Sequence, residues 1–319
     1  MALSCKISGT GLFVPKKVVT NKDLEKIVDT SDEWIFERTG IKERRLADWK
    51  NGETPSEMAS KSSLMAIKNA NLKVDDIDFI IFASTSGDYK LPNSASLLQQ
   101  KLGITNQCPA IDIAAACTGF VYGLTLAEGL IQTRMAKNIL VVGSEVMTNQ
   151  IDWTDRTMCV LFGDGSGAAV ISATEDESLT GSRLLAHTLM GDGSGKEAFC
   201  HLLGASAHPI TAENVDHPDR FMRMKGKEVF KFAVKALEDS VLKVLKKADL
   251  TLNDVTWIVP HQANARIIEA AAKRLDLDLS KFIINIHEAV ENQKIKRGDI
   301  VLLVAFGAGL SAGATLFRY

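Results

Sequence analysis

Short apolar runs alternate with segments of helical length along this chain, and this alternation constrains the fold more than any other feature. The runs DFIIFAS at Asp78–Ser84 and NILVVG at Asn138–Gly143 have the length and composition of strands buried on both faces. Ser94–Leu102 and Thr118–Met135 have the length and composition of helices. The alternation predicts a layered α/β fold with mostly parallel, buried sheets.

The second half of the chain repeats this rhythm. Gly226–Ala248 has apolar residues at helical spacing, and Val255–Val259, Ala263–Leu275 and Asp299–Phe306 follow as strand, helix and strand. In both halves a reactive residue stands between a strand and a helix, which suggests an internal duplication. Since the polar run EDESLT begins at residue 175, we expect an N-terminal half over 1–175 and a C-terminal half over 176–319.

Composition excludes several classes of protein. The chain has 319 residues and a net charge of -2, so no overall field favours nucleic acid or an anionic membrane. No apolar run reaches about 18 residues, and the N-terminus lacks the pattern of a signal peptide. The five cysteines are odd in number and show neither disulfide pairing nor zinc-site spacing. We therefore expect a cytoplasmic protein without a bound metal.

Cys117 is the first candidate for chemistry. It follows the strand-like PAIDIAAA and opens the helical TGFVYGLTLAEGLI. The free N–H groups and the positive dipole at a helix N-terminus favour thiolate over thiol, which would make this cysteine a nucleophile. The alternative is a small buried cysteine without chemistry, which is common. The other four cysteines have no such context.

His261 is the second candidate, because it also stands between a strand (VTWIVP) and a helix (QANARIIEAAAKRL). A neutral histidine can transfer a proton or donate a hydrogen bond to a developing oxyanion. The alternative is a histidine whose nitrogens are bound by nearby backbone. The turn Gly307-Ala308-Gly309 could aim a backbone N–H at the same oxyanion, with the N–H of Cys117 as the second donor.

Several motifs resemble one known family along nearly the whole chain. They are TSDEWIFERTGIKERR, AAACTGF, DRTMCVLFGDGSGAAV, MKGKEVFKFAV, PHQAN and VAFGAGLSAGATLFRY. Together they are similar to the ketoacyl-ACP synthase III enzymes of bacterial fatty-acid synthesis. The resemblance implies a thiolase-like, duplicated αβαβα layered fold.

The resemblance also implies a mechanism. Cys117 would take the acyl group of an acyl-CoA, most simply acetyl-CoA, and malonyl-ACP would then lose carbon dioxide. The resulting carbanion would attack the acyl-cysteine and give a 3-oxoacyl-ACP, which starts fatty-acid synthesis. His261 would stabilise the enolate, and the N–H groups of Cys117 and Ala308 the oxyanion. No cofactor is implied beyond these substrates.

The family's binding residues carry over in the same way. Residues that match those at the coenzyme A site are Trp34, Arg38, Arg156, Phe230 and Asn264. Residues that match the basic patch for acyl carrier protein are Lys231, Arg266 and Lys273. Each of these could instead be an ordinary surface or half-buried side chain. The family is homodimeric, and the stretch GDYKLPNSAS, with Leu91, lies where one subunit ends the acyl pocket of the other. The family often has Phe near the position of Leu91, and a smaller residue there would admit longer or branched primers.

The chain departs from the family at one place. The family's third catalytic residue is the Asn of a Gly-Asn-Thr-Ser motif, but here FIINI runs directly into HEAVENQKIKRGD, and the motif is missing near Asn285–Glu288. Neither Asn285 nor Asn292 matches it. Either the segment has been deleted, or the sequence as written omits it. The family-like flanks favour omission, since deletion within a core is strongly destabilising.

Three functions therefore stay open. The chain is a condensing enzyme that starts fatty acids, a condensing enzyme of a specialised pathway, or a non-condensing acyl-binding protein. Intact Cys117 and His261 argue for the first two, and the absent Asn for the third.

Overall fold

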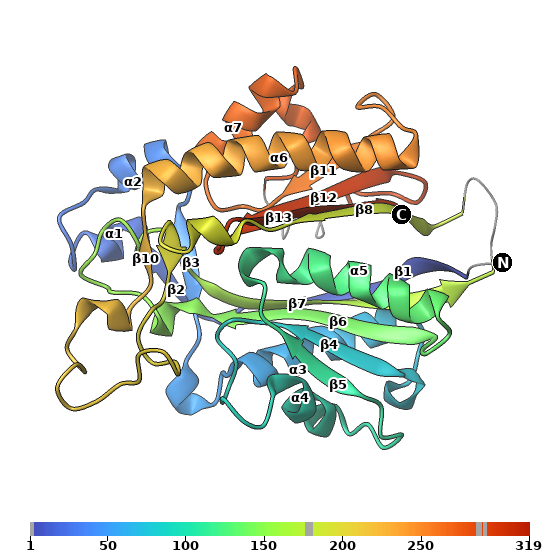
Figure 1. The fold of residues 1–319 in the computed structure, drawn as a ribbon, viewed down its shortest axis with the longest axis horizontal. Helices are drawn as coiled ribbons and strands as arrows, with labels where there is room; N and C mark the ends of the chain where they lie inside the picture. Colours follow the sequence, from blue (N-terminus) through green and yellow to red (C-terminus); the bar gives the residue numbers. More distant parts are fainter. Residues whose placement is uncertain (1–2, 176–180, 285–288, 290–291) are drawn as a thin grey trace.

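Two mixed β-sheets organise the computed structural model, which describes residues 3–175, 181–284, 289 and 292–319 (Figure 1). The first sheet has the order β1-β7-β6-β4-β5 and the second the order β11-β12-β13-β8. The strands of the first sheet are β1 (Ser4–Phe13), β4 (Phe79–Ala83), β5 (Ala110–Ile113), β6 (Asn138–Val146) and β7 (Asp164–Thr174). Those of the second are β8 (Arg183–Met190), β11 (Trp257–Pro260), β12 (Ile300–Gly307) and β13 (Ser311–Arg318).

Helices cover both sheets and fill the space between them. In Figure 1, α6 (Gly226–Ala248) and α7 (Ala265–Arg274) cover the outer face of the second sheet. The outer face of the first sheet is covered by α3 (Pro55–Asn69) and α4 (Ser94–Leu102). Helix α5 (Gly119–Gln132) lies between the sheets, where its apolar residues pack in one core with Val141 of β6 and Val301 of β12. These are the five layers of the expected αβαβα arrangement.

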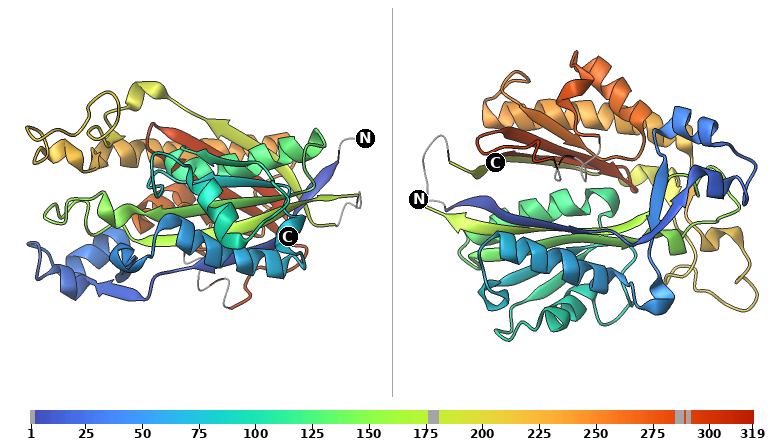
Figure 2. Two further views of the ribbon diagram at one scale, coloured as in Figure 1. Left: turned by 90° about the horizontal axis from the view of Figure 1, so that it is seen from below. Right: turned by 180° about the vertical axis from the view of Figure 1, so that it is seen from behind.

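Smaller elements lie at one end of the layers. They are α1 (Asn21–Leu24), α2 (Asp32–Thr39) and the two-stranded pairs β2 (Lys17–Thr20) with β3 (Glu43–Leu46) and β9 (Phe199–Cys200) with β10 (Arg223–Met224). Figure 2 shows that the segment around β9 and β10 projects from this end of the layers. Both termini lie at the opposite end (Figure 2).

The prediction of mostly parallel sheets is wrong. Of the nine strand pairings in the described residues, only β4–β5, β4–β6 and β11–β12 are parallel. Strand β13 follows β12 after the tight turn at 308–310, and such a connection produces an antiparallel pair. The apolar runs show that a strand is buried, but they do not report its direction.

The two sheets repeat one pattern of strand directions. Along β4-β6-β7-β1 the pairings are parallel, antiparallel and antiparallel, and β11-β12-β13-β8 has the same series. In the first sheet, β5 lies beside β4. At the corresponding place in the second sheet, beside β11, one parallel bridge joins Phe282 to Ile258. This correspondence supports the duplication. The expected boundary at 176–180 lies outside the described residues.

A contact between a half-buried carboxylate and a half-buried imidazole joins the two sheets through α5. Glu128 Oε2 of α5 lies 3.0 Å from His187 Nε2 of β8, whose Nδ1 is 2.9 Å from Thr315 Oγ1 of β13. We expect Glu128→Ala to lower the free energy of unfolding by about 1–3 kcal/mol, because His187 Nε2 is buried without a hydrogen bond and would lose the carboxylate that lies 3.0 Å away. Urea unfolding measures this. Glu57→Ala, which breaks only exposed contacts to Lys61 and Lys101, should cost at most about 1 kcal/mol. Equal costs for both variants would contradict the prediction.

Candidate active site

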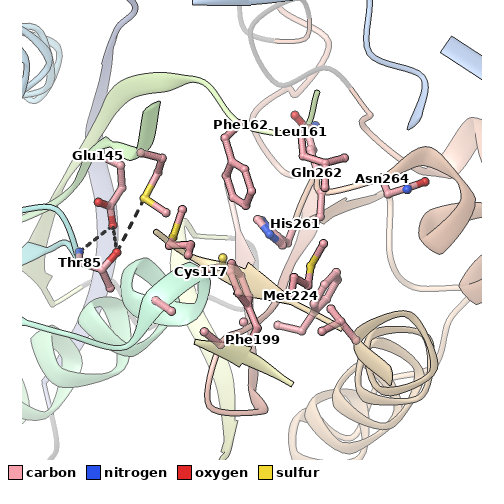
Figure 3. A pocket seen from close by; sticks show the side chains of 18 of the residues that line it. Thr85, Cys117, Glu145, Leu161, Phe162, Phe199, Met224, His261, Gln262 and Asn264 are labelled. Atoms are coloured by element: carbon pink, nitrogen blue, oxygen red, sulfur yellow. Dashed lines mark hydrogen bonds between the residues drawn. The ribbon is translucent and has the colours of Figure 1, made fainter. Parts of the chain in front are cut away.

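A cavity of about 800 Å³ is lined by residues from both sheets and from the segments that follow their strands, and both predicted reactive residues line it. Figure 3 shows Cys117 and His261 in the middle of the cavity, with Glu145 and Thr85 on one side and Gln262 and Asn264 on the other. Cys117 follows β5 of the first sheet, and His261 follows β11 of the second. The structure therefore brings together the two residues that the sequence placed at separate strand–helix junctions.

Cys117 is held in a strained turn at the end of β5. It lies in the one-turn 3-10 helix Ala116–Thr118, directly before α5, and Ala116 has a φ of +46°. A residue other than glycine costs roughly 1–2 kcal/mol in this left-handed conformation. Neighbouring bonds fix the turn, because the Thr118 hydroxyl donates to Ala115 O at 2.6 Å and lies 3.0 Å from the Ser311 hydroxyl of β13.

Gly307, at the end of β12, touches the backbone of this turn. A Cβ atom at Gly307 would lie 2.9 Å from Cys117 N and 3.1 Å from Cys117 Cβ, closer than such atoms normally approach. Ala308 follows and lines the cavity beside Cys117, and Gly309 has a φ of +71°. The predicted glycine turn and the cysteine are therefore neighbours, and glycine is needed at 307 for the contact.

His261 is held by the same strand. Its backbone N–H donates to Val304 O of β12 at 2.8 Å, and its ring packs edge-on against Phe306, with centroids 5.1 Å apart. Burial lowers the pKa of His261 to about 4. The imidazole is therefore neutral near pH 7 and can donate a hydrogen bond into the cavity.

The protonation state of Cys117 differs from the sequence-based expectation. Burial, with a smaller contribution from the charge of Glu145, raises the pKa of the Cys117 thiol to about 11. The loss of hydration therefore outweighs the stabilisation of a thiolate that the start of α5 was expected to give. At neutral pH the resting residue is a thiol, and it must lose its proton as it attacks.

This pKa predicts how Cys117 reacts with pH. Alkylation by iodoacetamide should accelerate about tenfold per pH unit between pH 7 and 9, because the thiolate is the reacting species. Intact-protein mass after timed quenching measures the rate, with Cys117→Ala as the control for the other cysteines. A rate that levels off near pH 7 would show that the helix N-terminus lowers the pKa of Cys117 more than burial raises it.

Several residues that line the cavity were not foreseen. Glu145, at the end of β6, is the main one, and its carboxylate is bound by the segment that follows β4. Others are Thr85, Met147, Gln150, Phe199, Cys200, His201, Met222 and Met224. The carboxyl ends of neighbouring parallel strands meet at one edge of a sheet, so the position of Glu145 after NILVVG could have indicated it.

The predicted coenzyme A residues fall into two groups. Phe230 and Asn264 line the cavity, and Asn264 also caps α7 by accepting a bond from Arg266 N at 2.9 Å. Trp34, Arg38 and Arg156 do not line it, but they lie together: the guanidinium carbons are 4.7 and 5.1 Å from the centroid of the indole ring. An aromatic ring beside two cations is suited to a nucleotide with its phosphates.

The three predicted carrier-protein residues are exposed. Lys231 lies on α6, and Arg266 and Lys273 lie on the neighbouring α7. Within the described part of the chain none of the three forms an ion pair. They are therefore available to an acidic partner.

No described residue of the cavity wall matches the motif of the family's third catalytic residue. Gln262 donates from Nε2 to Ile283 O at 3.1 Å, and Asn264, an asparagine of the wall, accepts the cap bond of α7 through Oδ1. Asn285 lies outside the described residues, and Asn292 is exposed and does not line the cavity. No described group of His, Cys, Asp and Glu could hold a metal ion, and no described helix is long and apolar enough to cross a membrane.

Fold and cavity together define an acyltransferase of the thiolase-like class, with a cysteine and a histidine in the wall of one cavity. Family models agree. The model of 3-oxoacyl-[acyl-carrier-protein] synthase III matches residues 111–195, and the model of its C-terminal part matches 245–288 and 282–319. The chain belongs to the 3-oxoacyl-[acyl-carrier-protein] synthase III family.

Individual relatives cover the chain almost completely. The beta-ketoacyl-[acyl-carrier-protein] synthase III of Caldanaerobacter subterraneus subsp. tengcongensis is 43% identical over 99% of this chain and 98% of its own. The crystal structure of the Aquifex aeolicus synthase III matches with a TM-score of 0.89 and 42% identity, over 99% of this chain and 100% of that one. The Thermus thermophilus structure matches with a TM-score of 0.89 and 37% identity, over 98% of this chain and 99% of that one.

These comparisons also locate the missing segment. The first alignment extends over 332 residues, 13 more than the 319 of this chain. The C-terminal family model matches in two pieces that meet at 282–288, where the Gly-Asn-Thr-Ser motif is missing. The relatives therefore have residues that this sequence lacks, and the break in the family match lies at this place.

Proposed function

We propose that the chain condenses an acyl-CoA primer, with acetyl-CoA first, with malonyl-ACP to give 3-oxoacyl-ACP and so initiates fatty-acid synthesis. The observation that carries the proposal is the shared cavity of Cys117 and a neutral His261 between the two halves. The names of the relatives point to the same reaction.

The residues take the following roles. Cys117 Sγ bonds to the acyl carbonyl carbon and displaces the thiol of coenzyme A, while the N–H groups of Cys117 and Ala308 stabilise the oxyanion. Malonyl-ACP then loses carbon dioxide, and His261 donates a hydrogen bond to the enolate oxygen. The enolate carbon attacks the acyl carbonyl, and the Cys117 sulfur leaves. The reaction needs neither a metal nor an organic cofactor.

The substrates enter from the side of α6 and α7. Trp34, Arg38 and Arg156 hold the nucleotide of coenzyme A, and Phe230 and Asn264 line the passage of the pantetheine arm. Two further proposals follow from the family: the protein acts as a homodimer, with Leu91 of one subunit at the acyl pocket of the other, and it works in the cytoplasm. The 87% exposure of Leu91 supports the homodimer, and the five free cysteines support the cytoplasmic location.

The test is the intact mass of the protein after incubation with acetyl-CoA, followed by addition of malonyl-ACP and measurement of carbon dioxide. We expect an acetyl adduct that is absent from Cys117→Ala, and release of carbon dioxide that depends on malonyl-ACP. A folded protein of 34.7 kDa without an adduct would overturn the acyl-enzyme. A mass above 34.7 kDa would show that the motif-bearing segment is present in the protein but omitted from the sequence.

The missing asparagine supports a second candidate function, that of a non-condensing acyl-binding protein. It predicts an adduct on Cys117 without release of carbon dioxide. A condensing enzyme of a specialised pathway would release carbon dioxide but prefer another primer, so a panel of acyl-CoA primers separates it from the first function.

The basic surface on α6 and α7 gives a prediction about the carrier protein. The double variant Lys231→Glu, Arg266→Glu should raise KM for malonyl-ACP about tenfold or more at low salt, because it reverses the local field that attracts an acidic partner. The effect should shrink at high ionic strength, where charges are screened. Lys101→Glu, on the opposite face, is the control. If KM is unchanged in the double variant, this surface is not the docking site.

A further inference from the structure

Glu145 is an unusual member of the cavity wall. Among the described residues that line the cavity it carries the one carboxylate, and no lysine or arginine lines the cavity with it. The residue is at the C-terminal end of β6, which runs parallel to β4. The segment Ser84–Ser86 leaves β4 at the same edge of the sheet, beside this carboxylate.

The carboxylate is bound almost entirely by that segment. Oε1 accepts bonds from Thr85 N at 2.9 Å and Thr85 Oγ1 at 3.2 Å. Oε2 accepts bonds from Ser86 N at 3.0 Å, from Ser84 Oγ at 3.1 Å and from the Ser86 hydroxyl. The Ser86 hydroxyl in turn accepts from Val146 N at 2.8 Å, so the segment and the end of β6 are bound reciprocally.

The place of this group relative to Cys117 gives it a role. Asn264 lies on the other side of Cys117 from Thr85 and Glu145 (Figure 3), and under the proposed function it lines the passage of the pantetheine arm, so the thioester enters from that side. Figure 3 shows Cys117 between that side and the pair formed by Thr85 and Glu145. An acyl group bonded to Cys117 extends away from the entrance, toward Thr85, Glu145 and Met147. We call this part of the cavity the acyl end.

We propose that Glu145 is the positioning residue of the acyl end: its carboxylate holds Ser84–Ser86 so that Thr85 narrows the cavity against long acyl chains. The inference rests on the proposed function, because it concerns which acyl groups Cys117 accepts. Five donors on three consecutive residues converge on one carboxylate, and they keep the backbone of the segment against β6. Without this anchor the segment moves outward and the acyl end deepens.

The cost of placing a carboxylate here supports a specific role. Burial raises the pKa of Glu145, while the bonds from Ser84, Thr85 and Ser86 oppose that shift. An apolar residue would close the wall without this cost of desolvation, but it would not bind the two backbone N–H groups of Thr85 and Ser86.

The test compares acylation of Cys117 by acetyl-CoA and by hexanoyl-CoA in single-turnover experiments read by intact mass. In Glu145→Gln, the side-chain NH2 group replaces the oxygen that accepted the bond from the Ser86 N–H. Two donors then point at each other, and that hydrogen bond is lost. We expect the hexanoyl-to-acetyl ratio of acylation rates to rise about fivefold, the equivalent of about one lost hydrogen bond. Ser86→Ala, which removes one donor and keeps the carboxylate, should raise the ratio less.

Asp78→Asn is the matched control. Asp78 lies at the other end of the same strands and accepts backbone bonds from Lys137 and Asn138 at 2.8 and 2.9 Å. It should leave the ratio unchanged even if it lowers stability. A ratio in Glu145→Gln that equals that of the wild type, or falls below it, overturns the proposal, as does an equal rise in Asp78→Asn. If no acyl-CoA acylates the wild-type protein, the proposed function itself has failed.

Discussion

His261→Ala is expected to lower the decarboxylation of malonyl-ACP by about 10²–10³-fold, while acetylation of Cys117 falls much less. The imidazole is neutral and lines the cavity, and Figure 3 shows it between Cys117 and the side-chain amides of Gln262 and Asn264. His261 is therefore the described side chain that we assign to the enolate. Release of carbon dioxide and the intact mass measure the two steps separately.

His217→Ala is the control for this experiment, because His217 is exposed and lies outside the cavity wall. It should leave both steps within about twofold. If His261→Ala lowers acetylation as much as decarboxylation, the imidazole acts on the thiol of Cys117, and its assignment to the enolate is wrong. If the mass shows that the segment is deleted, the wild type should acetylate faster than it decarboxylates, because the family's asparagine donor is then absent.

Gly307→Ala should abolish measurable acetylation of Cys117 while the protein still folds. The added methyl group would lie 2.9 Å from Cys117 N and 3.1 Å from Cys117 Cβ, so the strained turn at Ala116 must shift. A displacement of about 1 Å at a catalytic group can cost on the order of 10²-fold in rate. Intact mass after incubation with acetyl-CoA measures the loss.

Gly129→Ala is the matched control, because nothing lies within 4 Å of the added methyl group on α5. It should leave acetylation unchanged and raise the stability slightly, as alanine favours a helix over glycine. Normal acetylation by Gly307→Ala would mean that the turn tolerates the shift. Circular dichroism and the unfolding midpoint exclude a general loss of structure as the cause.

The candidate site could be predicted where the signal is local. Cys117 and His261 each stand between an apolar strand and a helix, and that pattern is readable from adjacent residues. Glu145 could not be recognised in the same way, because its role comes from bonds to Ser84–Ser86, some 60 residues away. The pKa of Cys117 was misjudged because sequence shows the start of a helix but not the burial that removes water from the thiol.

Helix α3 shows the limit of periodicity for the fold. Its buried face contains serines, among them Ser56, Ser62 and Ser63, and these interrupt the apolar stripe formed by Met58, Ala59, Ala66 and Ile67. The reason is close packing. A Cβ atom on Gly9 or Gly11 of β1 would come within 2.2 Å of a backbone oxygen of this helix, so only small residues fit at the contact. The residues on the buried face of such a helix are determined by close contact with the neighbouring strand, so the helix is hard to recognise from its own sequence pattern.

The high pKa of Cys117 has a consequence for oxidative damage. Peroxides attack thiolates, and a thiol with a pKa of about 11 is ionised in about one molecule in 10⁴ at pH 7. The nucleophile should therefore survive peroxide concentrations that convert low-pKa cysteines to sulfenic and sulfinic acids.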